Sequence, residues 1–420
     1  MTIAEFAELI GTVNTVLAFM LWICCAYRLF YILVPFFKKI GHKNPEKLHS
    51  YAILISARNE ENVIENLLES IRSQDYPSEL IHTFVIADNC TDSTAEIARN
   101  AGATVYERTN KEKVGKGYAL NALLENIAAD FGKDNFDGYF VIDADNLLTE
   151  NYISEMNKTF SDGYSVVTSY RNSKNYGDNW ISSGYALWFL HEAKYLNHSR
   201  AALGTSCAVS GTGFMFSKEI LSKADGWNFF LLTEDIEFSI WNVLNGEKIG
   251  YCPRAMLYDE QPTSFRQSWR QRLRWAKGYV QVLQKYGLKL FAGIFRKNGF
   301  ACFDMAMSIL PAVVFTILGF ALDIAAAAIT LACGGNALPI LLILGKNLSG
   351  AYLSMFFLGI FPLVSEWKRI RTTSFKKILS LFTFPVFMMT YLPISFTSLF
   401  TKVEWKPIVH KRAMKLKDLK

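Results

Sequence analysis

Residues 51–61 read YAILISARNEE, a short apolar run of strand length that ends in a polar cluster. Apolar residues then recur at helical spacing until the chain reaches Pro77. The same pattern returns at residues 84–92 (FVIADNCTD) and 139–146 (YFVIDADN), where an apolar run again ends in acidic residues. Strands that alternate with helices indicate a parallel sheet. The sequence therefore predicts an α/β fold.

Acidic residues close the second and third of these predicted strands. Asp88 follows the second strand, and Asp143 and Asp145 follow the third. Ligands of a parallel sheet bind beyond the carboxyl ends of its strands, where carboxylates suit ribose hydroxyls or a hard divalent metal. An aspartate after a strand also caps helices and forms turns. Each cluster alone therefore leaves both interpretations open.

Apolar segments lie on both sides of this central region. Runs long enough to span a membrane, at about 20 residues per crossing, cover residues 11–37, 308–333 and 337–364. A fourth run, at residues 378–400, contains two prolines. The first run has no basic region ahead of it and no small-residue cleavage site. We therefore interpret it as an anchor and not as a removed signal peptide.

Basic residues set the expected orientation, because lysine and arginine gather on the cytoplasmic side of a membrane. They follow the first and third apolar runs and precede the second. We therefore expect a multi-pass protein of the cell membrane with a cytoplasmic central domain. The tail at 401–420 is basic as well, so we expect 378–400 to form interfacial or re-entrant helices that leave the tail inside. A fourth span with an external tail is the alternative.

Charge and cysteine content argue against other classes of protein. The net charge of +6 comes from basic residues beside apolar segments and not from blocks that would bind nucleic acid. The seven cysteines include no C-x-x-C spacing, which disfavours a disulfide framework or a zinc site. We expect membrane lipid as a partner and no nucleic acid.

Two later motifs complete an ordered set. Residues 233–235 (TED) precede residues 271–275 (QRLRW) by about 40 positions, and a membrane region follows. Together with residues 56–60 (SARNE) and the aspartate clusters, this order resembles glycosyltransferase family 2 nearly continuously from residue 51 to about residue 278. Within that family the chain is similar to the cellulose, hyaluronan, chitin and bacterial poly-N-acetylglucosamine synthases.

The resemblance implies a division of the chain into segments. It implies a GT-A domain, the Rossmann-like α/β fold that binds nucleotide-sugars, inserted between transmembrane helices and flanked by amphipathic interface helices. The expected segments are an N-terminal transmembrane helix at 1–40, the cytosolic GT-A domain at 48–262, interface helices at 263–300, a two-helix transmembrane hairpin at 301–364, interfacial or re-entrant helices at 365–400 and a cytosolic gating tail at 401–420.

The resemblance also implies how a UDP-sugar donor is bound. It implies that Glu60 and Asp88 hold the uridine, while Asp143 contributes to the diphosphate site. Asp145 becomes the ligand of a divalent metal, Mg²⁺ or Mn²⁺. Lys116, in the segment GKGY, is similar to the lysine that contacts the diphosphate in the family, although a solvated loop lysine is the alternative.

For the chemical step, the resemblance implies that Asp235 is the general base. This carboxylate would remove the proton from the acceptor hydroxyl as that hydroxyl attacks the sugar carbon. Glu234 is the rival for the same role because it is the adjacent residue. Arg274 would face the diphosphate. A single displacement needs no covalent nucleophile and inverts the anomeric centre.

Acceptor and gating roles follow from the same resemblance. Trp275 would stack on the terminal acceptor sugar, with Gln271 beside it. Gly211 lies in a turn that takes the place of the family's acceptor motif, but the aromatic residues of that motif are missing here. Trp405 and His410 are similar to the segment that closes over bound UDP. An ordinary surface histidine is the alternative for His410.

The expected function is polymerisation of sugar from a UDP-sugar by a processive, inverting enzyme, coupled to polymer export. UDP-glucose, which would give a β-glucan such as cellulose or a mixed-linkage glucan, is favoured over UDP-N-acetylglucosamine. The expected partners are the donor, a growing polysaccharide, and a homo-oligomer or an accessory export or regulatory subunit. One alternative is transfer of a single sugar to a polyprenyl phosphate or glycolipid. Another is a UDP-sugar-binding membrane protein without catalysis.

Two charges interrupt the expected hairpin. Asp323 and Lys346 lie at similar distances from the turn between its helices. An isolated charge inside a bilayer is costly, so such residues pair or face a polar cavity. We therefore expect Asp323 and Lys346 to face each other, as an ion pair or on the wall of a polymer channel.

Overall fold

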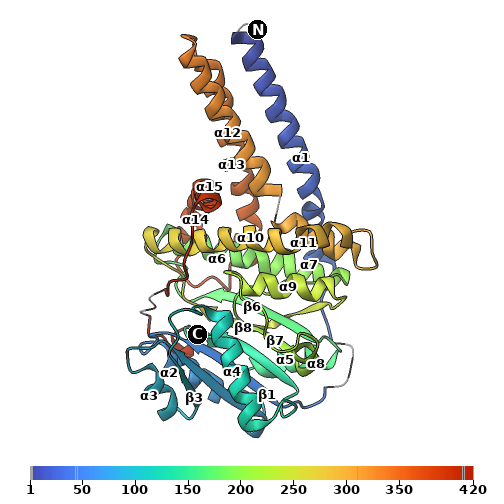
Figure 1. Ribbon diagram of the computed structural model, residues 1–420, viewed down its shortest axis with the longest axis vertical. Coiled ribbons are helices and arrows are strands. Elements are labelled where there is room, and N and C mark those ends of the chain that lie inside the picture. The colour runs from blue at the N-terminus through green and yellow to red at the C-terminus, as the bar shows by residue number, and fades with distance from the viewer. Residues whose placement is uncertain are drawn as a thin grey trace.

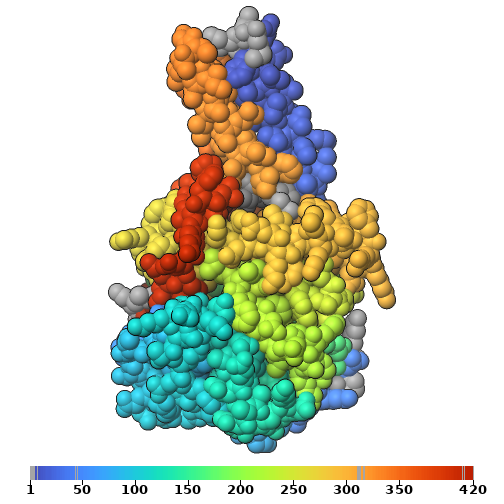
Figure 2. Space-filling model, in the orientation of Figure 1, coloured from blue at the N-terminus to red at the C-terminus, as the bar shows by residue number. Residues whose placement is uncertain are grey.

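The computed structural model describes residues 3–42, 44, 46–309, 311–408, 410 and 412–419. An α/β domain forms one end of the molecule and a stalk of long helices forms the other, with a layer of further helices between them (Figure 1). The domain is broad and the stalk narrow in the space-filling view (Figure 2).

The central sheet has eight strands in the order β3-β2-β1-β4-β7-β6-β8-β5. Their bounds are β1 Tyr51–Ala57, β2 Ile81–Asp88, β3 Thr104–Arg108, β4 Gly138–Asp143, β5 Leu147–Leu148, β6 Val166–Ser173, β7 Phe214–Ser217 and β8 Ile249–Asp259. All three predicted strands are present, which confirms the α/β class.

The sheet is mixed and not purely parallel. Strands β1, β2, β3 and β4 pair in parallel, whereas β7 runs against both β4 and β6. Strand β8 is parallel to β6, and β5 runs against β8. The chain enters β7 from the turn at 210–213, beside the carboxyl end of β4, so this short strand needs no crossover helix. That turn therefore lies at the edge where β1, β2 and β4 end.

Helices cover both faces of the sheet. They are α2 Ile64–Arg72, α3 Thr94–Asn100, α4 Lys116–Phe131, α5 Tyr152–Ser161, α8 Lys218–Lys223 and α9 Glu234–Leu244. Helix α2 buries Ile64, Leu67, Leu68 and Ile71 at the spacing that the sequence predicts. These residues share a core with β1 and β4, while α4 packs into a second core on the opposite face.

A layer of helices separates the domain from the stalk. It contains α6 Trp180–His191, a π-helical turn at Glu192–Asn197, α7 His198–Leu203, α10 Phe265–Gly293, α11 Gly299–Ile309, α14 Ser374–Met389 and α15 Tyr391–Phe400. Helix α10 runs across the top of the domain (Figure 1). At Gly278 it approaches Thr233 so closely that an added Cβ would lie 2.5 Å from the threonine side chain. The sequence Thr233-Glu234-Asp235 is thereby placed directly beneath α10.

The stalk consists of α1 Ile3–Phe37, α12 Pro311–Ala332 and α13 Leu338–Ser365 (Figure 1). Among the described residues, three helical stretches are long and apolar enough to cross a membrane: Glu8–Phe37, Leu338–Ser365 and Ser374–Phe400. The last stretch is broken into α14 and α15, which lie at the base of the stalk (Figure 1). Its assignment as interfacial and the segment bounds stay predictions, because length and composition alone also qualify it as a span.

The expected pairing of Asp323 with Lys346 is wrong. The buried Asp323 carboxylate accepts hydrogen bonds from Asn14 of α1 at 2.5 Å and from Asn347 of α13 at 2.9 Å. Adjacent residues of an α-helix point about 100° apart. Because Asn347 faces Asp323, Lys346 is directed away from it and lines a groove between α1 and α13.

A second buried carboxylate, Asp304 of α11, joins the stalk to the helical layer. Its oxygens lie 2.7 Å from Nε and 3.0 Å from Nη2 of Arg200 on α7. The hydroxyls of Tyr27 and Tyr31 on α1 donate to the same carboxylate at 2.7 and 2.9 Å. Arg200 and Asp304 are both almost completely buried. This Asp304 cluster therefore holds α1, α7 and α11 in one fixed arrangement.

Candidate active site

The loop after β1 brings Glu60 to the carboxyl edge of the sheet. Asn59 adopts φ = 57°, a conformation that asparagine tolerates better than most residues. Its side chain accepts a hydrogen bond from the backbone N–H of Thr91 at 2.8 Å, and the N–H of Glu60 donates to the Thr94 hydroxyl at 2.8 Å. The loops after β1 and β2 are thus tied together, and Glu60 is buried there.

Asp88 ends β2 at the same edge and is buried. The guanidinium of Arg108, which ends the neighbouring strand β3, forms an ion pair with its carboxylate. The side-chain amide of Asn89 donates a further hydrogen bond at 3.1 Å. The two residues expected to hold the uridine, Glu60 and Asp88, therefore lie at the carboxyl ends of the adjacent strands β1 and β2.

A continuous chain of polar contacts joins four of the predicted site residues. Lys116, at the start of α4, forms an ion pair with Asp143 at the end of β4. The same ammonium donates to the carbonyl of Gly211 at 2.7 Å. The backbone N–H of Gly211 in turn donates to Asp235 Oδ2 at 2.6 Å. The structure thus brings together Lys116, Asp143, Gly211 and Asp235, which come from separate parts of the sequence.

Gly211 is required by this geometry. Its φ of +72° lies in the left-handed region, which glycine adopts without strain. A Cβ at this position would also lie 4.0 Å from Asp235 Oδ2. The turn therefore presents the Gly211 N–H to Asp235. This contact is made by the backbone, so it does not need the aromatic residues that the family's acceptor motif carries.

Glu234 and Asp235 form the first turn of α9, beneath α10. Burial raises the pKa of Asp235, although the backbone N–H groups of Ile236 and Gly211 oppose that rise. Burial and the negative charge of Asp235 raise the pKa of Glu234. Lys116 and Arg274 lower both values in part. A carboxylate with a raised pKa is a better proton acceptor, which suits general-base chemistry.

Asp145 has the opposite electrostatic character. Its Oδ2 accepts a hydrogen bond from the backbone N–H of Glu260 at 2.9 Å. Burial opposes ionisation, but His410, Lys174 and the Glu260 N–H together hold the pKa of Asp145 below its usual value. An ionised carboxylate at a strand end is the ligand that a hard divalent cation prefers.

The donor set around Asp145 fits a metal that shares its coordination with substrate. Within the described part of the chain, no three His, Cys, Asp or Glu side chains are grouped so as to hold a metal ion by themselves. Mg²⁺ is commonly bound through one or two carboxylates, with phosphate and water oxygens completing its shell. Asp143 and Asp145 match that pattern.

The C-terminal tail covers this edge of the sheet. His410 Nδ1 lies 3.0 Å from each carboxylate oxygen of Glu60, a residue 350 positions away. Burial disfavours the imidazolium, but the charges of Asp145, Glu60 and Glu260 prevail and raise the pKa of His410 to about 10. Burial raises the pKa of Glu60, and His410 opposes that rise. A buried carboxyl group and a histidine therefore meet at the predicted nucleotide site.

Other contacts fasten the tail along its length. The ring of Trp405 lies 5.3 Å from the guanidinium of Arg58. Arg412 pairs with Asp178 at 2.7 Å, and Lys415 pairs with Glu69 at 2.8 Å. In Figure 2 the C-terminal segment runs from the base of the stalk onto the α/β domain. The tail thus reaches the site from the side of the stalk.

Helix α10 carries the motif at residues 271–275. Arg274 donates to the carbonyl of Leu232 at 3.3 Å and so lies beside the turn that begins α9. Trp275 packs edge-to-face against Tyr185 of α6, with ring centres 5.7 Å apart. The Gln271 carbonyl oxygen is buried and finds no hydrogen-bond partner among the described residues. Trp275 and Gln271 are therefore separate from the polar chain around Lys116.

Several residues at the site were missed by sequence reasoning. Lys174, just after β6, is buried and donates to the Asp145 carbonyl. Arg171 pairs with Asp259 at the end of β8 and donates to the Ser210 carbonyl at 3.1 Å. Half-buried Glu192 receives a hydrogen bond from Ser210. The signal was available for Asp259, because residues 255–260 (AMLYDE) are another apolar run that ends in acids.

A family model described as "Glycosyltransferase like family 2" matches residues 49–278. A beta-monoglucosyldiacylglycerol synthase of Synechocystis sp. (strain ATCC 27184 / PCC 6803 / Kazusa) is 26% identical over 56% of this chain and 48% of that protein. A poly-beta-1,6-N-acetyl-D-glucosamine synthase of Staphylococcus epidermidis is 26% identical over 62% of this chain and 63% of that protein. The chain therefore spans about half to two thirds of the length of these relatives.

A solved structure shares the fold. The mannosyltransferase PcManGT from Pyrobaculum calidifontis, in complex with GDP-Man and Mn²⁺, aligns with a TM-score of 0.63. The alignment covers 93% of this chain and 99% of that chain at 16% sequence identity. The GT-A-like α/β fold expected from the sequence is thereby confirmed.

Proposed function

This chain belongs to glycosyltransferase family 2, and on that premise we propose that it is a membrane-bound, inverting enzyme that polymerises sugar from a UDP-sugar. The chain of contacts from Asp143 through Lys116 and Gly211 to Asp235 carries the proposal. These contacts link the Asp143 carboxylate, which suits a diphosphate site, with the Asp235 carboxylate, whose pKa is raised. A donor and an acceptor bound at the two ends of this chain of contacts would lie next to each other.

In the proposed reaction, Asp235 accepts the proton of the acceptor hydroxyl while that oxygen attacks the anomeric carbon of the donor. The bond to the diphosphate breaks in the same displacement, so an α-linked donor gives a β-linked product. Lys116 and Arg274 stabilise the negative charge that develops on the departing UDP. Glu60 and Asp88 hold the uridine, beneath Trp405 and His410 of the tail.

The divalent cation of this reaction would be held by Asp145 and Asp143. Mg²⁺ or Mn²⁺ supplies charge neutralisation at the diphosphate when it is bound there. The Glu260 N–H holds the Asp145 carboxylate, and Lys174 binds the backbone carbonyl of the same residue. The charges of His410 and Lys174, with the Glu260 N–H, lower the pKa of Asp145 and keep it ionised. Replacement of Asp145 should therefore weaken UDP binding only when the metal is present.

The acceptor is proposed to bind beneath α10, with Trp275 stacked on its terminal sugar and Gln271 beside it. The apolar helices α14 and α15 adjoin this position at the base of the stalk. With the acceptor site next to the apolar helices, the product would grow at the membrane surface, and the α/β domain would lie in the cytoplasm. Polymer export, a second copy of the chain or an accessory subunit belong to the same proposal.

Transfer of a single sugar to a lipid is the second candidate. The similarity to a beta-monoglucosyldiacylglycerol synthase favours it, and so do the apolar helices beside α10. The number of sugars added to one acceptor separates the two candidates.

The decisive experiment is a product assay with the purified chain in nanodiscs. UDP-glucose and UDP-N-acetylglucosamine are supplied separately, with Mg²⁺, with Mn²⁺ or with a chelator, and released UDP is measured. We expect metal-dependent release with UDP-glucose and a ladder of products that a β-specific glucanase digests. A single added sugar on extracted lipid would establish the second candidate. Equal release by wild type and Asp235→Asn would contradict both.

A further inference from the structure

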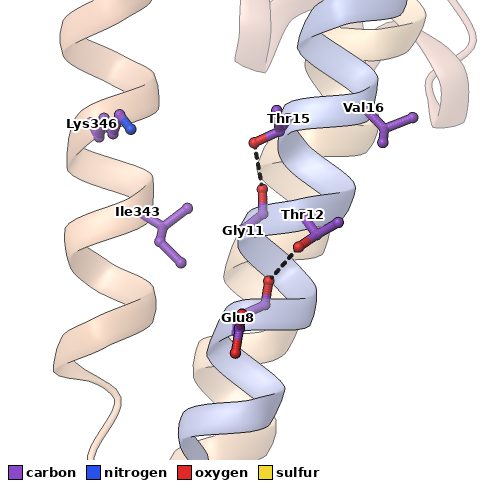
Figure 3. Close-up of a pocket in the computed structure, with 7 residues that line it drawn as sticks. All are labelled: Glu8, Gly11, Thr12, Thr15, Val16, Ile343 and Lys346. Atoms are coloured by element: carbon purple, nitrogen blue, oxygen red, sulfur yellow. Dashed lines mark hydrogen bonds between the residues drawn. The ribbon is translucent and has the colours of Figure 1, made fainter.

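A groove between α1 and α13 carries polar groups in an otherwise apolar part of the stalk. It has a volume of about 590 Å³ and is lined by Glu8, Gly11, Thr12, Thr15, Val16, Ile343 and Lys346. Figure 3 shows Ile343 and Lys346 on α13 across from the stripe on α1 that contains the other five residues. This set of seven residues is called the stalk groove below.

Both charged side chains of the stalk groove are accessible and lack a partner in the described part of the chain. Among the residues whose side chains the structure describes, neither the Glu8 carboxylate nor the Lys346 ammonium has a hydrogen bond or an ion pair. Charges within membrane segments are costly and usually mark a binding site or a pairing surface. Asp323 shows that this stalk satisfies a buried charge where it can, because Asn14 and Asn347 both donate to it.

The two threonines offer acceptor oxygens to the stalk groove. The Thr12 hydroxyl donates to the Glu8 carbonyl at 2.9 Å, and the Thr15 hydroxyl donates to the Gly11 carbonyl at 2.8 Å (Figure 3). Their hydrogens are thus engaged within α1, while their oxygen lone pairs remain available. With Glu8, they form a region of hydrogen-bond acceptors on α1, and Lys346 supplies the donor on α13.

The stalk groove lies at the depth of lipid headgroups if the stalk crosses the membrane as proposed. Glu8 precedes Arg28 by 20 residues, and Lys346 precedes Glu366 by 20 residues. Arg28 and Glu366 mark the base of the stalk through contacts to Ser308 and to Lys194. A rise of about 1.5 Å per residue makes each interval about 30 Å, the thickness of the hydrocarbon core.

Below the stalk groove, the same face of α1 becomes entirely apolar. Phe19, Met20 and Ile23 are between 44% and 59% exposed. A polar end above an apolar face matches the layout of one phospholipid, whereas a polysaccharide would need polar contacts along its whole path. The change of character thus favours a lipid over a sugar polymer as the occupant.

We propose that the stalk groove binds the headgroup of a zwitterionic phospholipid. Lys346 contacts the phosphate, and Glu8, with the hydroxyl oxygens of Thr12 and Thr15, contacts the ammonium group. Gly11 and Ile343 lie at the same level of the stalk, because Cδ1 of Ile343 is 3.7 Å from a Cβ built at Gly11. From that level, Glu8 lies toward the outer end of α1, whereas Lys346 lies toward the α/β domain. The order of charges along the stalk therefore matches a lipid whose ammonium lies outside its phosphate.

Native mass spectrometry of the full chain, released from micelles that contain one added lipid, tests this proposal. Phosphatidylethanolamine carries both charges, and phosphatidylglycerol carries only the phosphate. We expect wild type to retain phosphatidylethanolamine better. Lys346→Met should reduce retention of both lipids about tenfold, as expected for loss of one charged hydrogen bond. Glu8→Gln should reduce retention of phosphatidylethanolamine alone.

Two further variants keep the test decisive. Lys368→Met removes a cation at the opposite end of α13 and should leave retention unchanged. Gly11→Leu fills the stalk groove without altering charge and should displace both lipids, even if Lys346→Met proves unstable. Equal retention of phosphatidylethanolamine by wild type, Lys346→Met and Gly11→Leu would overturn the proposal. A wild-type dimer that Lys346→Met dissociates would also overturn it, because the face would then be a protein interface.

Discussion

Asp304 and Asp235 are both acidic residues withdrawn from solvent, but their surroundings differ. Asp304 receives hydrogen bonds from Arg200, Tyr27 and Tyr31, so a cation and two hydroxyls fix its charge and position. Asp235 accepts backbone N–H groups and has the acidic Glu234 beside it, and its pKa is raised. The donors around Asp304 hold its charge for a structural purpose, whereas burial opposes the ionisation of Asp235 and prepares this carboxylate to take a proton.

Substitution of Asp235 tests the difference between the two carboxylates most directly. Asp235→Asn should lower the rate of sugar transfer by about 10²–10⁴-fold, the usual contribution of a general base. UDP binding and thermal stability should stay close to wild type, because among the described residues no cation forms an ion pair with the Asp235 carboxylate. Steady-state transfer assays, calorimetric UDP titrations and thermal unfolding measure the three quantities. Asp137→Asn, at the opposite edge of the sheet, is the matched control. A transfer rate within tenfold of wild type would remove Asp235 from the base role.

At Asp304 the same substitution should act on stability. Asp304→Asn leaves Arg200 buried without a counter-charge, which typically costs about 3–5 kcal/mol in the free energy of unfolding. Denaturant unfolding of the protein in nanodiscs, followed by fluorescence, measures the loss. The control Asp137→Asn breaks a half-exposed pair with Lys218, while its amide oxygen can still accept from the Ser50 N–H, and should cost about 1 kcal/mol. Equal losses in the two variants would show that Asp304 has no special structural role.

Lys116 tests whether the polar chain serves the donor. Lys116→Met should lower kcat/KM for the UDP-sugar by about 10²-fold, the effect of removing one donor to developing charge. Lys116→Arg keeps the charge and should recover part of the loss. The measurement is initial-rate kinetics at varied donor concentration. An unchanged kcat/KM would show that the contacts of Lys116 are structural and that this lysine does not serve the donor.

The pH dependence of sugar transfer tests the roles of Glu234 and Asp235. The pKa values of Glu234 and Asp235 are both raised, so transfer should fall as the pH drops and the base becomes protonated. Glu234→Gln removes a negative neighbour, which lowers the pKa of Asp235 and should move this acidic limb to lower pH. Activity near neutrality should stay within about tenfold of wild type. Loss of nearly all activity in Glu234→Gln would instead identify Glu234 as the base.

The same substitution has a predictable effect on stability. A folded-state pKa above the unfolded value means that the folded protein binds the proton more tightly. Wild type therefore loses stability as the pH rises from about 4.5 to about 7. Glu234→Gln should lose less stability over this range, because only Asp235 of the pair still has a raised pKa. Thermal unfolding of both proteins across a pH series checks the sign.

Trp405 should give the smallest effect. Its contact with Arg58 is a cation–π interaction, which is worth about 0.5–1 kcal/mol at an accessible site. Trp405→Ala should therefore raise KM for the donor about two- to fivefold, while Trp405→Phe should recover part of this loss. Donor-dependent kinetics provide the measurement. An increase in kcat with unchanged KM would show that the tail limits turnover and does not help to capture the donor.

The α/β fold could be predicted because its signals are local. Each strand is an apolar run, and a strand that runs parallel to its neighbours places Asp88 and Asp143 at one edge of the sheet. Identification of β7 was harder, since its four residues follow a glycine turn and run in the opposite direction. Short return strands of this kind carry too little pattern to reveal their direction.

The site could be predicted only in part, for geometric reasons. The contact between Glu60 and His410 joins residues 350 positions apart, and only the family resemblance pointed to the tail. The resemblance assigns a role to Arg274 and none to Arg272. Arg272 is nevertheless fully buried and donates to the Phe387 carbonyl of α14 at 3.1 Å. Residues two apart on a helix point in nearly opposite directions. The rotation of α10 about its own axis decides which of the two arginines faces α14. A single sequence does not show that rotation.

The Asp304 cluster also constrains the order of events during synthesis. Arg200 belongs to the part of the chain made early, but its counter-charge lies 104 positions later in α11. At about 5–20 residues per second, Arg200 would wait roughly 5–20 s for Asp304 to emerge from the ribosome. Until then α7 cannot settle against α1 without burying an unpaired guanidinium. The α/β domain therefore has to remain loosely docked to α1 until α11 has been made, so assembly is completed from the C-terminal side.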